Sequence, residues 1–170
     1  VLKYLSEYFK ITLLYFNPNI SPKEEYEKRV AEQKRLIEEM EFKYPVTMLE
    51  GRYEPSEFYE AVKGLENVPE GGERCFICYE MRMREAAEYA RRTGADYFTT
   101  TLSISPLKNA DKINEIGKKL EAEYGVRHLP SDFKKKEGYK QSIELSKEYN
   151  LYRQNFCGCV FSKNGDKENV

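Results

Sequence analysis

Apolar residues along the chain alternate between short runs and stripes at helical spacing. Residues 11–16 form a short apolar run that ends at Asn17 and Pro18, which predicts a buried strand feeding a loop. Further strands are expected at 44–49, 96–102 and 126–129, and helices at 55–65, 74–92 and 138–150. Two more helices are expected from the apolar stripes of Tyr26, Val30, Ile37, Met40 and of Ile113, Ile116, Leu120, Tyr124.

The ends of these elements carry helix signals. Ser21 to Glu24 has the form of a capping box with Pro22 at the first helical position, and Gly94 is placed to end the helix over 74–92. Strands separated by helices predict an α/β fold with a parallel sheet and helices on both faces. Loops 17–20 and 103–109 should then meet at the carboxyl edge of that sheet. With no internal repeat and no linker, residues 1–170 are predicted to form a single α/β domain.

Composition narrows the class of protein. A chain of 170 residues with 40% apolar and 34% charged residues is large and apolar enough for a folded core, which excludes a disordered protein. No apolar run reaches the roughly 18 residues of a membrane helix, and four cysteines among so many charges do not indicate a secreted disulfide module. We therefore expect a cytoplasmic protein. Its net charge of −1 means that any RNA contact must use a local basic patch.

The first cysteine pair, Cys75 and Cys78, opens a predicted helix directly after a Gly-rich loop. Residues three apart share a helix face, so both sulfurs can point to one place. The helix N-terminus and the neighbouring Arg74 favour thiolates, the form that binds metal, and Arg82 continues the same face. The alternative is a pair of buried structural cysteines.

The second pair, Cys157 and Cys159, flanks Gly158 near the C-terminus. Two sulfurs at this spacing can close a small, strained disulfide or chelate one metal ion, and a strained disulfide is easily reduced. The alternative is a chance pair in a loose terminal segment. Together the two pairs allow a four-thiolate site for zinc or for an iron–sulfur cluster.

Other candidate residues have competing explanations. His128, the only histidine, is expected in a structural role before a catalytic one. The triplet Lys134, Lys135 and Lys136 is either a solvated loop or a phosphate contact. Tyr79 or Tyr139 could donate a proton or stack on a base.

A set of motifs runs along nearly the whole chain. It comprises residues 15–20, Glu25, Tyr26, Arg29, Arg74, Cys75, Cys78, Tyr79, Arg82, 100–102, Ser105, Pro106, Lys108, Gly138, Tyr139, 151–154, Cys157, Gly158, Cys159, Phe161 and Ser162. With these motifs in this order, the chain resembles the QueH epoxyqueuosine reductases. The resemblance implies a Rossmann-like, nucleotide alpha-hydrolase-like fold. It also implies the last step of queuosine synthesis, which reduces epoxyqueuosine to queuosine at the wobble position of tRNA, with electrons from an unidentified donor.

The resemblance further implies a 4Fe–4S cluster with Cys75 and Cys78 among its ligands. Cys157 and Cys159 would be either a redox-active pair or ligands of a second, mononuclear iron. Around them, Arg82, Lys108 and Arg153 are expected to hold tRNA phosphates or anticodon bases, together with the lysine triplet. Tyr139 or Asp132 would supply a proton.

One departure from the family concerns the N-terminus. The family carries an adjacent Cys-Cys pair at the end of its first strand, and this chain has none. The chain begins at Val1 in a segment that already has a helical pattern. We expect a natural segment before Val1 that holds the central strand and two more cluster ligands.

Two other functions fit the cysteines. A four-Cys zinc-binding RNA module would need no redox chemistry. A thiol–disulfide oxidoreductase would use the pairs without metal, although such enzymes usually have one exposed Cys-x-x-Cys.

Overall fold

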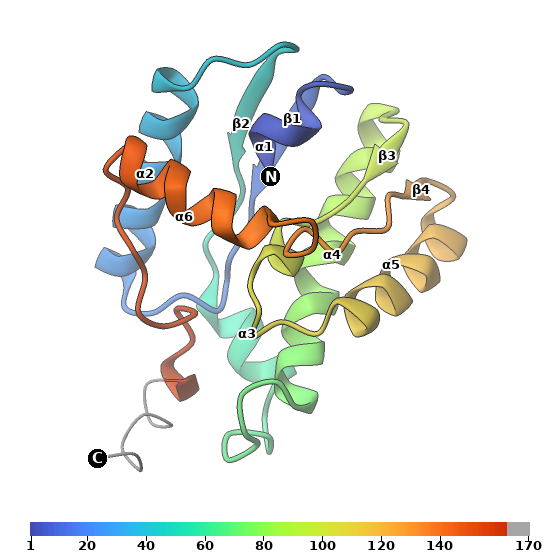
Figure 1. The fold of residues 1–170 in the computed structure, drawn as a ribbon. Helices are drawn as coiled ribbons and strands as arrows, with labels where there is room; N and C mark the ends of the chain where they lie inside the picture. The colour runs from blue at the N-terminus through green and yellow to red at the C-terminus, as the bar shows by residue number, and fades with distance from the viewer. Residues whose placement is uncertain (163–170) are drawn as a thin grey trace. The chain divides into compact units, whose positions relative to one another are not determined.

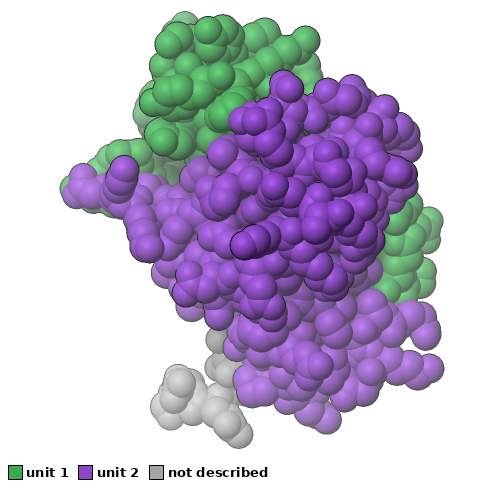
Figure 2. Space-filling view, turned by 90° about the vertical axis from the view of Figure 1, so that its right-hand side faces the viewer, with its two compact units in different colours: residues 1–57, 140–170 green, residues 58–139 purple. Residues whose placement is uncertain are grey.

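The structure, a computed structural model, describes residues 1–162. The chain divides into two compact units, the first from residues 1–57 and 140–170 and the second from residues 58–139 (Figure 2). The expected single domain over residues 1–170 stays a prediction. Among the described residues, no helix is both long enough and apolar enough to cross a membrane.

The first unit is built around two parallel strands, β1 (Ile11–Tyr15) and β2 (Val46–Glu50) (Figure 1). Ile11 pairs with Val46 and Tyr15 with Glu50, so both strands end at the same edge. The helix α2 (Lys23–Glu39) connects them and lies against β2. The unit also contains α1 (Leu2–Leu5), most of α6 (Gly138–Glu148) and the short 3-10 helix η2 (Val160–Ser162). The parallel pairing expected from the strand–helix alternation is confirmed here.

Two expectations for this unit are wrong in detail. The side chains of β1 are only half-buried or exposed, whereas the five residues that follow, 16–20, are all buried. The capping box does not form either, because α2 begins at Lys23 and Pro22 stands before it in an extended conformation, with no side-chain cap. The first turn instead carries Glu24 and Glu25, whose charges favour the positive end of the helix dipole.

The second unit pairs β3 (Tyr97–Phe98) with β4 (Arg127–His128), again in parallel. Its helices are the end of α3 (Pro55–Ala61), α4 (Glu73–Thr93) and α5 (Ala110–Tyr124), and its 3-10 turn is η1 (Leu102–Ile104). The predicted stop of α4 is confirmed, because Gly94 caps it in the left-handed region at φ 70°. The strand predicted over 96–102 is shorter, because the Thr100 hydroxyl accepts the Leu102 N–H and turns the chain.

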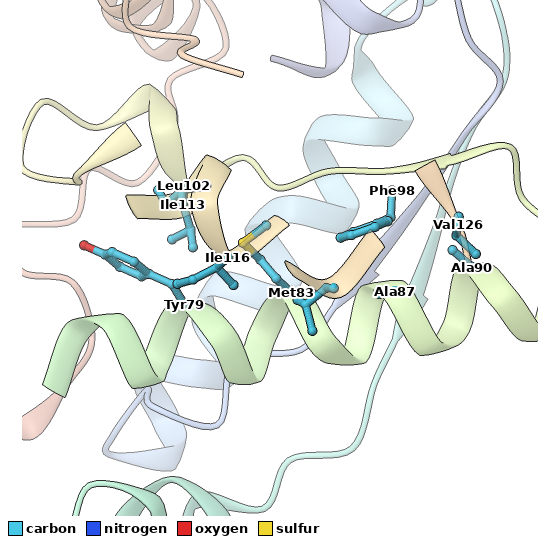
Figure 3. Packing of buried hydrophobic residues seen from close by; sticks show 10 residues of the cluster. Tyr79, Met83, Ala87, Ala90, Phe98, Leu102, Ile113, Ile116 and Val126 are labelled. Carbon is cyan, nitrogen blue, oxygen red and sulfur yellow. The ribbon is translucent and has the colours of Figure 1, made fainter. Parts of the chain in front are cut away.

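The core of the second unit lies between α4 and α5. Met83 and Ala87 on α4 pack with Ile113 on α5 (Figure 3). Leu120 of α5 belongs to the same core, and none of these four residues is exposed to solvent. The small side chain of Ala87 lets the two helices approach. Tyr79 is the member of this core nearest to the start of α4, which connects the core to the first cysteine pair.

His128 is a structural residue of the second unit. Its ring is buried next to Phe98, with the ring centroids 5.2 Å apart, and it fills the space beside Gly117 on α5. Burial lowers the pKa of His128 below its usual 6.5, and the nearby Glu121 carboxylate opposes this only in part. The expected structural role fits this placement.

The lowered pKa predicts an acid-sensitive fold. Because the folded state prefers the neutral imidazole, His128 stabilises the fold fully above pH 6.5, and this contribution falls as the pH drops toward the folded-state pKa. We expect urea unfolding to show lower stability at pH 5.5 than at pH 7.5. In a His128→Gln variant this difference should shrink, whatever the change in absolute stability. An equal pH dependence in both proteins would contradict the assignment.

Candidate active site

The first thiol pair sits in the first two turns of α4. Cys75 and Cys78 are both half-buried, and the Gly71 backbone N–H donates to the Cys75 sulfur at 3.2 Å. A backbone donor and the positive end of a helix both stabilise a thiolate. Arg82 follows four residues after Cys78 on the same face and is half-buried. This part of the site has the form predicted from the sequence.

Arg74 acts on the loop before the helix. Arg74 is 3% exposed, and its guanidinium donates to the carbonyls of Leu65, Glu66 and Val68. Three carbonyls bound to one buried cation fix the shape of the chain that leads into α4. Arg74 therefore supports the thiols indirectly, by holding the loop that delivers them.

The loop after β3 approaches the same end of α4. Burial raises the pKa of the Tyr79 phenol to about 12; Cys75 and Cys78 add to the rise, and the Lys108 ammonium opposes it. The Lys108 side chain is 11% exposed and pairs with Glu70 at 2.9 Å. Lys108 is thus a partly buried cation that is already paired with a carboxylate of the loop before α4.

The second thiol pair lies in a tight loop of the first unit. Cys159 is buried, Cys157 is half-buried, and the Cys157 sulfur lies 3.3 Å from the Ser162 hydroxyl. Gly158 has φ 100°, and a Cβ built on it would lie 2.7 Å from Cγ1 of Ile20. Only glycine fits this backbone and this space. The loop is therefore fixed in the structure, unlike a chance pair in a loose terminus.

Each thiol pair thus lies beside one of the two predicted strand-end loops. The Ser21 N–H donates to the Gly158 carbonyl at 2.9 Å, which joins the end of loop 17–20 to the second pair. In the second unit, Lys108 of loop 103–109 pairs with Glu70, and the N–H of the next residue, Gly71, donates to the Cys75 sulfur. The expectation that all four segments meet at one edge stays a prediction.

The thiols also bear on the cluster that the resemblance implies. Soft thiolates are the ligands that iron–sulfur clusters and zinc prefer. Within residues 1–162, neither unit by itself holds three or more Cys, His, Asp or Glu side chains grouped for a metal. The donor type therefore fits a thiolate-bound metal, and each unit offers two such ligands.

The remaining candidates lie on exposed segments. Tyr139 is 41% exposed in the first turn of α6, and Arg153 is exposed in the loop before Cys157. Lys134 and Lys135 both pair with Asp132, at 2.7 and 3.2 Å. The hydrogen bond from Lys134 lowers the pKa of Asp132, so this carboxyl is ionised at neutral pH and is a poor proton donor. Of the two expected proton donors, Asp132 is therefore a poor fit, and the role of Tyr139 stays a prediction.

Sequence reasoning gave no role to Arg29 and Ser162, which contact the second thiol loop, or to Glu25, which holds Arg29. Arg29 donates to two carbonyls of the loop, Glu25 pairs with Arg29 at 2.7 Å, and the Ser162 hydroxyl donates to the Cys159 carbonyl at 2.7 Å. The available signal was Arg29 itself, a charged residue on the buried face of α2 next to Tyr26 and Val30. Buried arginines are rare unless they are paired, so an arginine at such a position predicts a partner elsewhere in the fold.

Comparison with known proteins assigns the family. The model of the epoxyqueuosine reductase QueH family matches residues 1–165. The chain is 42% identical to epoxyqueuosine reductase QueH of Streptococcus pyogenes serotype M1 over 163 residues, which are 95% of this chain and 64% of that protein. The Staphylococcus epidermidis protein of the same name is 44% identical over 95% of this chain and 69% of its own length. The Thermotoga maritima protein of the same name is 39% identical over 87% of this chain and 77% of its own length. This chain, which spans slightly less than two thirds of the streptococcal protein, belongs to the epoxyqueuosine reductase QueH family.

Proposed function

We propose that the chain provides epoxyqueuosine reductase activity, the reductive deoxygenation of epoxyqueuosine to queuosine at the wobble position of tRNA. The observation that carries this proposal is the QueH family match over residues 1–165, a range that includes both thiol pairs. It favours neither a zinc-binding RNA module nor a thiol–disulfide oxidoreductase. Since tRNA is the substrate, we place the activity in the cytoplasm.

The proposed reaction needs two electrons and two protons. Converting an epoxide to an alkene breaks both C–O bonds and releases the oxygen as water. Oxidation of the Cys157 and Cys159 thiols to a disulfide supplies two electrons and two protons, and an external donor of unknown identity must then reduce the disulfide. This balance makes the dithiol a chemically sufficient reductant for one turnover.

The remaining chemistry is assigned to the first thiol pair and its neighbours. A 4Fe–4S cluster held in part by Cys75 and Cys78 would supply one-electron transfer and a Lewis acid for the epoxide oxygen. In the alternative assignment, Cys157 and Cys159 would bind a second, mononuclear iron and would not act as a redox-active pair. Arg82, on the face of the first pair, would hold a phosphate or base of the anticodon, and the exposed Tyr139 phenol would deliver a proton to the leaving oxygen.

For the fold we propose the finer class, a Rossmann-like, nucleotide alpha-hydrolase-like sheet. The parallel pairing in both units and the helices that follow the strands support it. Ligands of such folds bind at the carboxyl ends of the strands, where the chain leaves β1 for loop 17–20 and leaves β3 for residues 99–109.

The test is turnover on tRNA that carries epoxyqueuosine. We expect anaerobically purified protein to contain iron and sulfide, and to yield queuosine, measured by mass spectrometry of nucleosides, when a chemical reductant is added. A colourless protein that contains zinc, binds the tRNA and leaves epoxyqueuosine unchanged would contradict the proposal in favour of a zinc-binding RNA module.

The contribution of the lysine triplet to RNA binding can be tested through the salt dependence of tRNA affinity. Each lysine that contacts a phosphate releases counterions, so removing one should lower the slope of log affinity against log salt by about one unit. We expect this for Lys135→Ala and a larger loss for the Lys134–Lys136 triple-alanine variant. Asp132→Asn should strengthen binding, because Asp132 now holds Lys134 and Lys135.

Lys118→Ala is the matched control, since Lys118 is an exposed lysine on α5 that is not among the predicted RNA-binding residues. Its slope should equal that of the wild type. If the triple variant also shows the wild-type slope, the triplet is a solvated loop and the tRNA binds elsewhere.

A further inference from the structure

The backbone carbonyls of the second thiol loop, residues 156–159, are all hydrogen-bonded. Those of Phe156 and Cys157 accept from the two terminal nitrogens of Arg29, at 3.1 and 3.0 Å. The next carbonyl, of Gly158, accepts from the Ser21 N–H at 2.9 Å, and the last, of Cys159, accepts from Ser162. Four consecutive bound carbonyls leave the backbone of the loop little freedom to rotate.

Arg29 contributes two of these bonds and is itself held in place. Its side chain is 4% exposed, and its Nε donates to the Glu25 carboxylate at 2.7 Å. The same carboxylate accepts the Tyr152 hydroxyl at 3.2 Å, so Glu25 links Arg29 to the segment just before the loop. A guanidinium has a rigid planar fork that can bind two neighbouring acceptors at once, which a lysine cannot reproduce.

Arg29 also packs directly under the glycine between the two cysteines. A Cβ on Gly158 would lie 2.9 Å from Nη1 of Arg29. The guanidinium carbon is 5.1 Å from the centre of the Phe156 ring. The loop is therefore fixed by hydrogen bonds and by packing against the same side chain.

We propose that Arg29 is a positioning residue that holds the Cys157–Cys159 loop in its open dithiol form and disfavours the disulfide. In this form the Cys157 sulfur points at Ser162, 3.3 Å away, and Cys159 is buried. A disulfide needs a defined separation and orientation of its two Cβ atoms. Closing it across one glycine requires the backbone to turn, which strains the carbonyl bonds to Arg29.

This inference rests on the proposed redox role of the two thiols and deepens it. A disulfide that is disfavoured in the protein is easily reduced again. Arg29 would therefore make the dithiol a pair that is restored after each turnover and does not stay oxidised.

The test is the thiol–disulfide equilibrium with glutathione, in the presence of a metal chelator. In this reaction the two protein thiols and one oxidised glutathione give one protein disulfide and two reduced glutathiones. After acid quenching and alkylation, trypsin releases a peptide of residues 154–163, whose only cysteines are Cys157 and Cys159. Residues 75–82 carry the other pair and serve as an internal control.

We expect Arg29→Ala to raise the equilibrium constant for the Cys157–Cys159 disulfide about tenfold, equivalent to about 30 mV for a two-electron couple. Arg29→Lys should shift it in the same direction, because an ammonium cannot bind both carbonyls. The Cys75–Cys78 equilibrium should not change. If Arg29→Ala does not fold, Arg29→Lys decides the question.

Arg35→Ala is the matched control. Arg35 also lies on α2, pairs with Glu32 and Glu39, and donates to the carbonyl of Tyr149, so it joins α2 to the C-terminal segment without touching the thiol loop. An equilibrium constant unchanged in the folded Arg29 variants, or shifted equally by Arg35→Ala, would overturn the inference. Because no tRNA is used, this result is independent of whether the chain reduces epoxyqueuosine.

Discussion

Replacing Cys75 or Cys78 by serine is expected to remove bound iron and to lower turnover more than about 100-fold while the chain stays folded. Both thiols are half-buried at the start of α4, and Cys75 accepts a backbone hydrogen bond from Gly71. A serine hydroxyl is far less acidic than a thiol and is a poor ligand for iron–sulfur clusters. The variants should keep the circular dichroism spectrum of the wild type, because neither sulfur belongs to the fully buried core.

The control is Ile77→Ala, which shortens a half-buried side chain between the two cysteines. It should lose stability but keep iron and sulfide. Iron content is measured on anaerobically purified protein and turnover on tRNA carrying epoxyqueuosine. Full iron content with normal turnover in either serine variant would refute the ligand assignment.

Gly117→Ala is expected to destabilise the fold by about 2–3 kcal/mol. A Cβ at this position would lie 2.3–2.4 Å from three atoms of the buried His128 ring, far inside van der Waals contact. At an open helical position the same change would stabilise the protein by about 1 kcal/mol, because alanine has the higher helix propensity. The sign of the effect therefore separates packing from propensity.

A double-mutant cycle tests the cause. In a His128→Ala background the clash is gone, so Gly117→Ala should be neutral or stabilising, with a coupling of about 3 kcal/mol between the two positions. Ala122→Gly, at an exposed site of the same helix, measures the propensity term alone. Urea unfolding supplies all the values, and an equal effect of Gly117→Ala in both backgrounds would exclude the His128 contact as the cause.

The sequence by itself predicted the features that depend on neighbours in the chain. The stripe of Ile113, Ile116 and Leu120 predicted α5, whose buried face these residues form, and Gly94 marked the end of α4. The alternation of strands and helices predicted parallel pairing, found in both units. The same local reasoning placed each thiol pair, because Cys-x-x-Cys at a helix start and Cys-Gly-Cys in a turn are patterns of adjacent residues.

Only the tertiary structure decided the partners of the charged side chains. Arg29 reaches carbonyls more than 120 positions away, and Lys108 pairs with Glu70, 38 positions before it. The sequence had placed Lys108 among the RNA-binding cations, and it had given Arg29 no role. A long charged side chain has many rotamers and no periodicity, so its partner is set by whatever the fold brings within reach. Hydrophobic spacing is read along the chain, whereas these hydrogen bonds and ion pairs form only after folding.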